Sequence, residues 1–154
     1  MDDDTPYDIC VACECGDLPI SESELRRTIE RTLARHACPK ACLSVALVDD
    51  ARIAAVNRQY LHRRGPTDVI SFDLGGDDHG VDGEVVLSAE TARRESLSRG
   101  HSVAIEILLY AVHGTLHLLG FDDRTQAGAK AMHEEEDRIL TELGYGPVYG
   151  SDAR

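Results

Sequence analysis

The chain has 154 residues, of which 42% are hydrophobic, and a formal net charge of −12 at pH 7. This length suits one domain that buries roughly two thirds of its unfolded surface, so we expect residues 1–154 to form a single domain. The acidic balance excludes diffuse binding to nucleic acid, which depends on neutralisation of phosphates by Lys and Arg, but it leaves a local basic site open.

The N-terminal region predicts a strand and no export signal. Residues 1–4, Met-Asp-Asp-Asp, are acidic where a secretory signal requires positive charge. Residues 7–13 alternate apolar and polar side chains, which predicts a strand. The most apolar window, 103–119, is interrupted by Glu106, His113 and His117, so we expect no membrane span and a cytoplasmic location.

The cysteines allow two interpretations. Five cysteines, an odd number, all precede residue 43, which argues against a disulfide framework and suits a reducing cytoplasm. Their C-x2-C and C-x3-C spacings are compatible with a structural zinc. Free cysteine also behaves as a small buried hydrophobe, and we favour this second interpretation. The residues concerned are Cys10, Cys13, Cys15, Cys38 and Cys42.

A helix, a strand and a second helix follow. Ser21 and Glu24 form a capping box, and apolar residues at helical spacing continue to about residue 37. The apolar run 43–48 predicts a buried strand, and the acidic pair after it would cap a helix that reaches Tyr60. The Gly-Pro pair within 63–66 ends that helix.

The second half of the chain begins with strands and ends with helices. Strands are predicted at 68–72 and 84–87, separated by a polar, glycine-rich loop at 75–80. Three helices then follow, at about 88–99, 102–119 and 126–143. We therefore predict an α/β (α+β) fold, in which one mostly mixed sheet of about four strands packs against about five helices.

A metal-site pattern stands at the end of the apolar helix. Residues i and i+4 of a helix project from one face, so His113 and His117 can direct a ring nitrogen to one point. Gly120 allows the helix to end in a left-handed conformation, so that a residue of the segment Phe121-Asp-Asp123 can reach the same point. Two imidazoles and one carboxylate leave a coordination position open, which is typical of catalytic zinc.

Other interpretations of this pattern stay open. A histidine pair at helical spacing also occurs as a solvated or core-satisfied pair, and two histidines with a carboxylate can hold non-haem iron. The glycine and the third ligand favour one divalent metal, which we expect to be zinc. The spacing is similar to the extended zinc motif of metzincin proteases, but Gly114 stands where those enzymes need a glutamate as general base.

The whole segment, His113-Gly-Thr-Leu-His-Leu-Leu-Gly-Phe-Asp-Asp123, resembles the H-G-x-L-H-L-x-G-[FY]-D-H signature of the YbeY family of bacterial endoribonucleases. Residues 57–60 and 66–72 resemble its N-x-x-Y-R and P-T-D-V-L-S-F segments. Residues 82–88 are similar to its G-D-I-x-I-S strand, and 135–144 to its terminal helix. The resemblance covers most of residues 43–145.

This resemblance implies a metal-dependent, single-strand-specific endoribonuclease that acts in maturation of the 16S rRNA 3′ end and in ribosome quality control. It implies three partners, namely single-stranded rRNA, the small ribosomal subunit and an assembly GTPase. It assigns the metal ligands to His113, His117 and Asp123. Two further functions remain open: a non-catalytic ribosome assembly factor with a structural metal, and a zinc peptidase or amidase.

The chain departs from the family at three positions. Asp123 replaces the last histidine of the signature, Leu61 replaces the arginine after the tyrosine, and Glu84 replaces an aspartate. A carboxylate ligand lowers the charge left on the metal and should make its bound water less acidic.

Several residues are candidates for contact with the substrate. Arginine makes bidentate contacts with phosphate, so an arginine could offset the charge that develops on the RNA. The candidates are Arg63, Arg64, Arg93 and Arg94. Thr67, Asp68 and Ser71 could bind substrate or support the ligands, although the first two also fit a turn residue and a cap.

Overall fold

The computed structural model describes residues 5–16, 19–65, 67–76 and 80–149. Four strands and five helices are found in these ranges, which confirms the predicted fold class. In chain order they are β1 (Tyr7–Cys13), α1 (Glu22–Arg35), β2 (Ala41–Val48), α2 (Asp50–Leu61), β3 (Val69–Asp73), β4 (Val81–Ser88), α3 (Ala89–Arg99), α4 (Val103–Leu118) and α5 (Gln126–Glu142).

Local side-chain chemistry sets the starts of the helices. Ser21 accepts a hydrogen bond from the backbone N–H of Glu24, as the capping box predicts. Aspartate or serine caps start α2, α3 and α4 in the same way. Strand β4 begins three residues earlier than predicted, because it extends through Gly83 to pair along the whole length of β2. Part of the predicted loop at 75–80, residues 77–79, lies outside the described residues.

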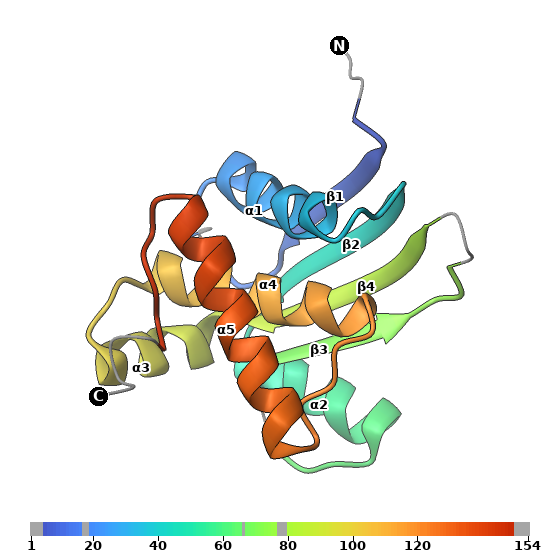
Figure 1. The fold of residues 1–154 in the computed structure, drawn as a ribbon. Helices are drawn as coiled ribbons and strands as arrows, with labels where there is room; N and C mark the ends of the chain where they lie inside the picture. Colours follow the sequence, from blue (N-terminus) through green and yellow to red (C-terminus); the bar gives the residue numbers. More distant parts are fainter. Residues whose placement is uncertain (1–4, 17–18, 66, 77–79, 150–154) are drawn as a thin grey trace.

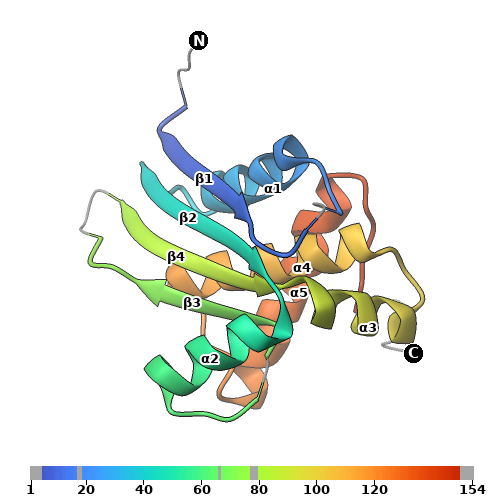
Figure 2. The ribbon, with the colours of Figure 1, turned by 180° about the vertical axis from the view of Figure 1, so that it is seen from behind.

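The sheet has the strand order β1-β2-β4-β3. Strands β1, β2 and β4 are parallel, and β3 pairs antiparallel with β4. Figures 1 and 2 show that α1, α4 and α5 lie on one side of this sheet, whereas α2 lies on the other side. Because strand side chains alternate between faces, Val69 and Ser71 of β3 point toward α4, and Ile70 and Phe72 point toward α2.

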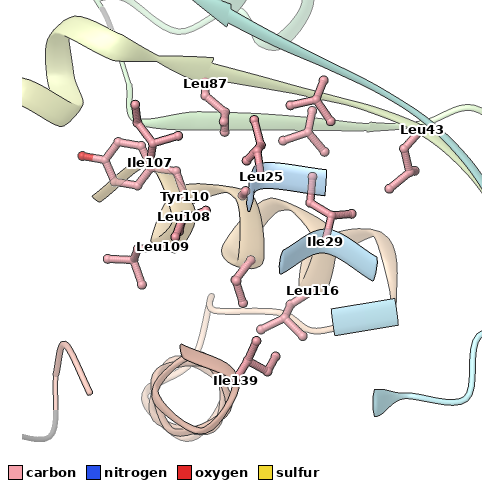
Figure 3. Packing of buried hydrophobic residues seen from close by; sticks show 14 of the residues in the cluster. Leu25, Ile29, Leu43, Leu87, Ile107, Leu108, Leu109, Tyr110, Leu116 and Ile139 are labelled. Carbon is pink, nitrogen blue, oxygen red and sulfur yellow. The ribbon is translucent and has the colours of Figure 1, made fainter. Parts of the chain in front are cut away.

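Helix α4 is the centre of the core. Its residues from Glu106 to Val112 are buried all round, which is expected of a helix enclosed by other elements. Figure 3 shows side chains from α1, α4, α5 and the sheet meeting in this cluster, among them Leu25, Leu87 and Ile139. The C-terminal end of α4, where the predicted ligands lie, is therefore attached to a rigid element.

The cysteines separate into three environments. Cys38 is buried, as the favoured interpretation predicts, but Cys10 and Cys42 are exposed. Cys13 and Cys15 are partly buried against the core, with their sulfur atoms 3.4 Å apart. Within the described ranges no cysteine belongs to a group of three or more metal-ligating side chains. In the same ranges, no helix is long and apolar enough to cross a membrane.

Candidate metal centre

The last turn of α4 folds the chain back on itself. The backbone N–H groups of Gly120 and Phe121 donate to the carbonyls of His117 and Leu116, which closes the end of the helix. Gly120 has φ +104°, a conformation that side chains rarely adopt. The three residues that follow therefore run back toward the face of α4 that carries the two histidines.

This turn brings the three predicted ligands together. The Nε2 atoms of His113 and His117 are 3.2 Å apart. The carboxylate of Asp123 lies 3.4 Å from Nε2 of His113 and 3.7 Å from Nε2 of His117. Within the described ranges, these are the residues whose ligand atoms are grouped closely enough for a metal ion.

The spacing of these atoms fits zinc. Nitrogen and oxygen ligands at 2.0–2.2 Å from a tetrahedral zinc are about 3.3–3.6 Å from one another, which is close to the separations above. The donor set also suits the ion, because zinc accepts imidazole and carboxylate together. Asp123 is 40% exposed, and this leaves the outer side of the group open to a fourth ligand. The residues therefore satisfy both the geometry and the chemistry of an open zinc site.

His113 is held from behind by a buried carboxylate. Glu136 of α5 has no exposed surface, and its Oε2 lies 2.5 Å from Nδ1 of His113. Burial alone would lower the pKa of His113, but the hydrogen bond and the charge of Glu136 outweigh it and leave this pKa raised. Burial raises the pKa of Glu136, and the contact with His113 only partly offsets that effect.

Gly114 allows α4 to lie directly on the sheet. A Cβ atom at this position would meet Val85 Cγ1 at 2.8 Å and Val69 Cγ2 at 3.0 Å. Ser71 Oγ donates a hydrogen bond of 2.8 Å to the Gly114 carbonyl, which joins β3 to the helix between the two histidines. The glycine that removes the general base of a protease is thus also a packing residue, and a glutamate side chain has no room there.

The histidines open onto a cleft of 620 Å³ between the end of α4 and the segment around β3. Arg63, Thr67, Asp68 and Ser71 line this cleft. Arg64 is exposed and is not among the lining residues. Asp68 is fixed by the N–H of Val69, at 2.8 Å, and by the hydroxyl of Thr67, at 3.3 Å.

The second arginine doublet lies elsewhere. Arg93 and Arg94 belong to α3 and do not line the cleft. Arg94 is paired with Asp50 at 2.5 Å and also donates to Thr91. The structure therefore does not bring either residue to the cleft, and a role for them toward RNA stays a prediction.

Sequence reasoning missed two features of this site. Arg124 lines the cleft, and its guanidinium pairs with Asp122 at 2.7 Å. Glu136 was also missed, although the sequence carries a signal for it. An acidic residue stands at helical spacing among Met132, Ile139 and Leu140, and all three are buried in the structure.

Comparison with known proteins agrees with this architecture. The protein family described as endoribonuclease YbeY matches residues 11–144. An endoribonuclease YbeY of Moorella thermoacetica is 42% identical over 145 residues, covering 84% of this chain and 92% of that protein. One from Geobacillus kaustophilus is 38% identical over 138 residues, covering 79% and 88% of the two chains.

A solved structure shows the same fold. The solution structure of a Thermotoga maritima protein covers 94% of this chain and 97% of its own, with a TM-score of 0.58 and 22% sequence identity. The fold, the three grouped side chains and the adjoining cleft are the features expected of a metal-dependent hydrolase. The chain belongs to the YbeY family of endoribonucleases, which are hydrolases that act on RNA.

Proposed function

We propose that this protein is a metal-dependent endoribonuclease that cleaves single-stranded rRNA, in 16S 3′-end maturation and in ribosome quality control. His113, His117 and Asp123 would hold one divalent metal, which we assign as zinc. The observation that carries the proposal is the grouping of these three ligands at the wall of an open cleft, in a chain of this family. The proposal includes a cytoplasmic location.

The residues of the cleft have separate roles in this proposal. When bound, zinc supplies Lewis-acid polarisation of a phosphoryl oxygen and lowers the pKa of water. Arg63, at the cleft, would offset negative charge on the phosphate. Asp68 is fixed by two hydrogen bonds and would accept a hydrogen bond from the substrate. Ser71 serves the packing of α4 through its bond to Gly114.

A cleavage assay tests the proposal. Purified protein, His117→Ala and the matched control His133→Ala are incubated with single-stranded and duplex rRNA fragments, and their folding is checked by circular dichroism. His133 lies on α5 and stacks on Tyr149, away from the cleft. We expect cleavage of single strands by wild type and by His133→Ala, and none by a folded His117→Ala. Equal cleavage by all three would refute the nuclease site.

The charge of the cleft supports a second part of the proposal. Four carboxylates line it, on Asp68, Asp73, Asp122 and Asp123, against the arginines Arg63 and Arg124. Such a surface attracts phosphate weakly, so we propose that the small ribosomal subunit, with an assembly GTPase, presents the RNA. A steep salt dependence for the binding of free RNA would contradict this.

The same observation keeps a non-catalytic assembly factor as a second candidate. An acidic cleft, with Leu61 where the family has arginine, is compatible with a protein that binds a ribosomal particle without cleaving its RNA. Binding to purified small subunits, together with no cleavage by zinc-loaded wild type, would favour this function. The peptidase alternative has no support, because Gly114 faces the sheet.

A further inference from the structure

Glu136 is a buried charged side chain that the fold does not explain. It lies on α5 on the side that also carries Met132, Ile139 and Leu140, and it has no exposed surface. One carboxylate oxygen contacts His113, and the other, Oε1, has no hydrogen-bond partner among the described residues. Burying a carboxylate with an unsatisfied oxygen costs free energy, and an uncharged side chain of similar shape would avoid most of that cost.

The contact with His113 suggests what the carboxylate does. Glu136 can only accept a hydrogen bond when ionised, so a neutral His113 must carry its proton on Nδ1. The lone pair of the imidazole then stands on Nε2, the atom that lies 3.2 Å from His117 Nε2 and 3.4 Å from Asp123. A carboxylate behind a histidine ligand fixes the tautomer and the ring orientation and increases the basicity of the ligand.

We propose that Glu136 is a positioning residue that holds His113 in its metal-binding tautomer and orientation. The inference rests on the proposed metal site, and it adds a residue that does not touch the metal. This role predicts that the affinity for zinc depends on the Glu136 carboxylate. It also predicts that the stability of the fold does not depend on this carboxylate.

The chain offers a matched control. His101 and Glu106 form a second pair between a histidine and a carboxylate, and Glu106 likewise has no exposed surface. Glu106 is also 3.5 Å from Arg99, and neither residue of the pair lines the cleft. Replacing Glu106 by glutamine therefore removes a buried carboxylate from α4 without touching the metal ligands.

The experiment compares zinc affinity by competition with a chromophoric chelator, and the absorption spectrum of the Co²⁺ form, for wild type, Glu136→Gln, Glu106→Gln and His117→Ala. We expect Glu136→Gln to bind zinc about 10- to 100-fold more weakly and to change the Co²⁺ spectrum. Its metal-free melting temperature should stay close to that of wild type. Glu106→Gln should bind zinc with unchanged affinity.

The outcomes separate the two proposals. Wild-type zinc affinity in folded Glu136→Gln would overturn the positioning role. If at the same time His117→Ala loses zinc binding, the proposal of a metal site still holds. Failure of wild type itself to bind zinc would overturn the metal site. If Glu136→Gln does not fold, NMR of zinc-loaded wild type decides: a His113 proton on Nδ1 supports the role, and one on Nε2 contradicts it.

Discussion

Replacing Gly114 with alanine tests whether close packing of α4 on the sheet sets the positions of both histidines. The added methyl group would lie 2.8 Å from Val85 and 3.0 Å from both Ser71 Oγ and Val69. All three separations are shorter than ordinary van der Waals contacts. The Ser71 hydroxyl is also bonded to the Gly114 carbonyl, so the helix cannot move away from the sheet without losing this bond.

The expected size of the effect follows from three contributions. Alanine is a better helix former than glycine by about 1 kcal/mol, which stabilises the variant. Overpacking of a well-packed site costs about 1–3 kcal/mol, and loss of the Ser71 hydrogen bond costs about 1 kcal/mol. We therefore expect Gly114→Ala to lower the free energy of unfolding by about 1–3 kcal/mol. In a domain of this size that corresponds to a melting temperature lower by about 2–12 °C.

The assay is denaturant unfolding of metal-free protein, together with zinc affinity by chelator competition. Gly114 lies between the two histidines, so a displaced helix should also weaken zinc binding. The matched control is Gly100→Ala. Gly100 has φ +79° and no neighbour within 4 Å of an added Cβ, so this variant should lose stability through backbone strain and keep its zinc affinity. Unchanged stability and zinc affinity in Gly114→Ala would refute the packing argument.

Three further predictions concern the third ligand, the metal and an ion-pair cluster. Asp123→His should keep zinc and RNA cleavage, since it restores the family residue; a folded variant without zinc would show that the loop cannot seat an imidazole. Free zinc at 100 times its dissociation constant should raise the free energy of unfolding of wild type by about 2.7 kcal/mol, as measured by denaturant unfolding. A chelator should reverse this increase, and an unchanged free energy of unfolding would contradict zinc binding to the native state. Glu135→Gln should destabilise the protein by about 2 kcal/mol at pH 7, because Glu135 is bonded to Arg35, Arg138 and His36. Burial raises the pKa of Glu135, but these partners outweigh it and hold the pKa below 4.5. The stability that the Glu135 carboxylate contributes is therefore present above pH 4.5 and is lost as the pH falls through its lowered pKa. A constant difference between pH 3 and pH 7 would contradict this assignment.

The elements that sequence predicts best are those set by local chemistry. Ser21, Asp49, Ser88 and Ser102 each cap a helix within a few residues of their own position, so no distant contact is needed to place those starts. Strand β4 is different. Its first residues, including Asp82 and Gly83, have little strand propensity, and they become a strand because β2 pairs with them.

The candidate site divides in the same way. Helical spacing brings His113 and His117 together, and a glycine turn returns Asp123 to them, so sequence alone predicts all three as a group. Glu136 reaches His113 from a different helix, across the packing of α4 against α5. The ion pair of Arg94 with Asp50 was likewise not predictable, because an arginine doublet carries no information about which carboxylate it pairs with.

Asp123 and Leu61, two departures from the family pattern, both reduce the positive charge of the cleft. With Asp123 as a ligand, a zinc ion and its three protein ligands carry a net charge of +1, since one carboxylate offsets part of the +2 of the ion. Leu61 lines the cleft where the family has an arginine, which removes a second positive charge. Asp68 and Asp73 line the same cleft and lower its potential further, whereas the charge of Asp122 is offset by its ion pair with Arg124. Under the proposed function, charge attraction would contribute little to RNA binding, and we propose that the surface that presents the RNA sets the position of the scissile phosphate.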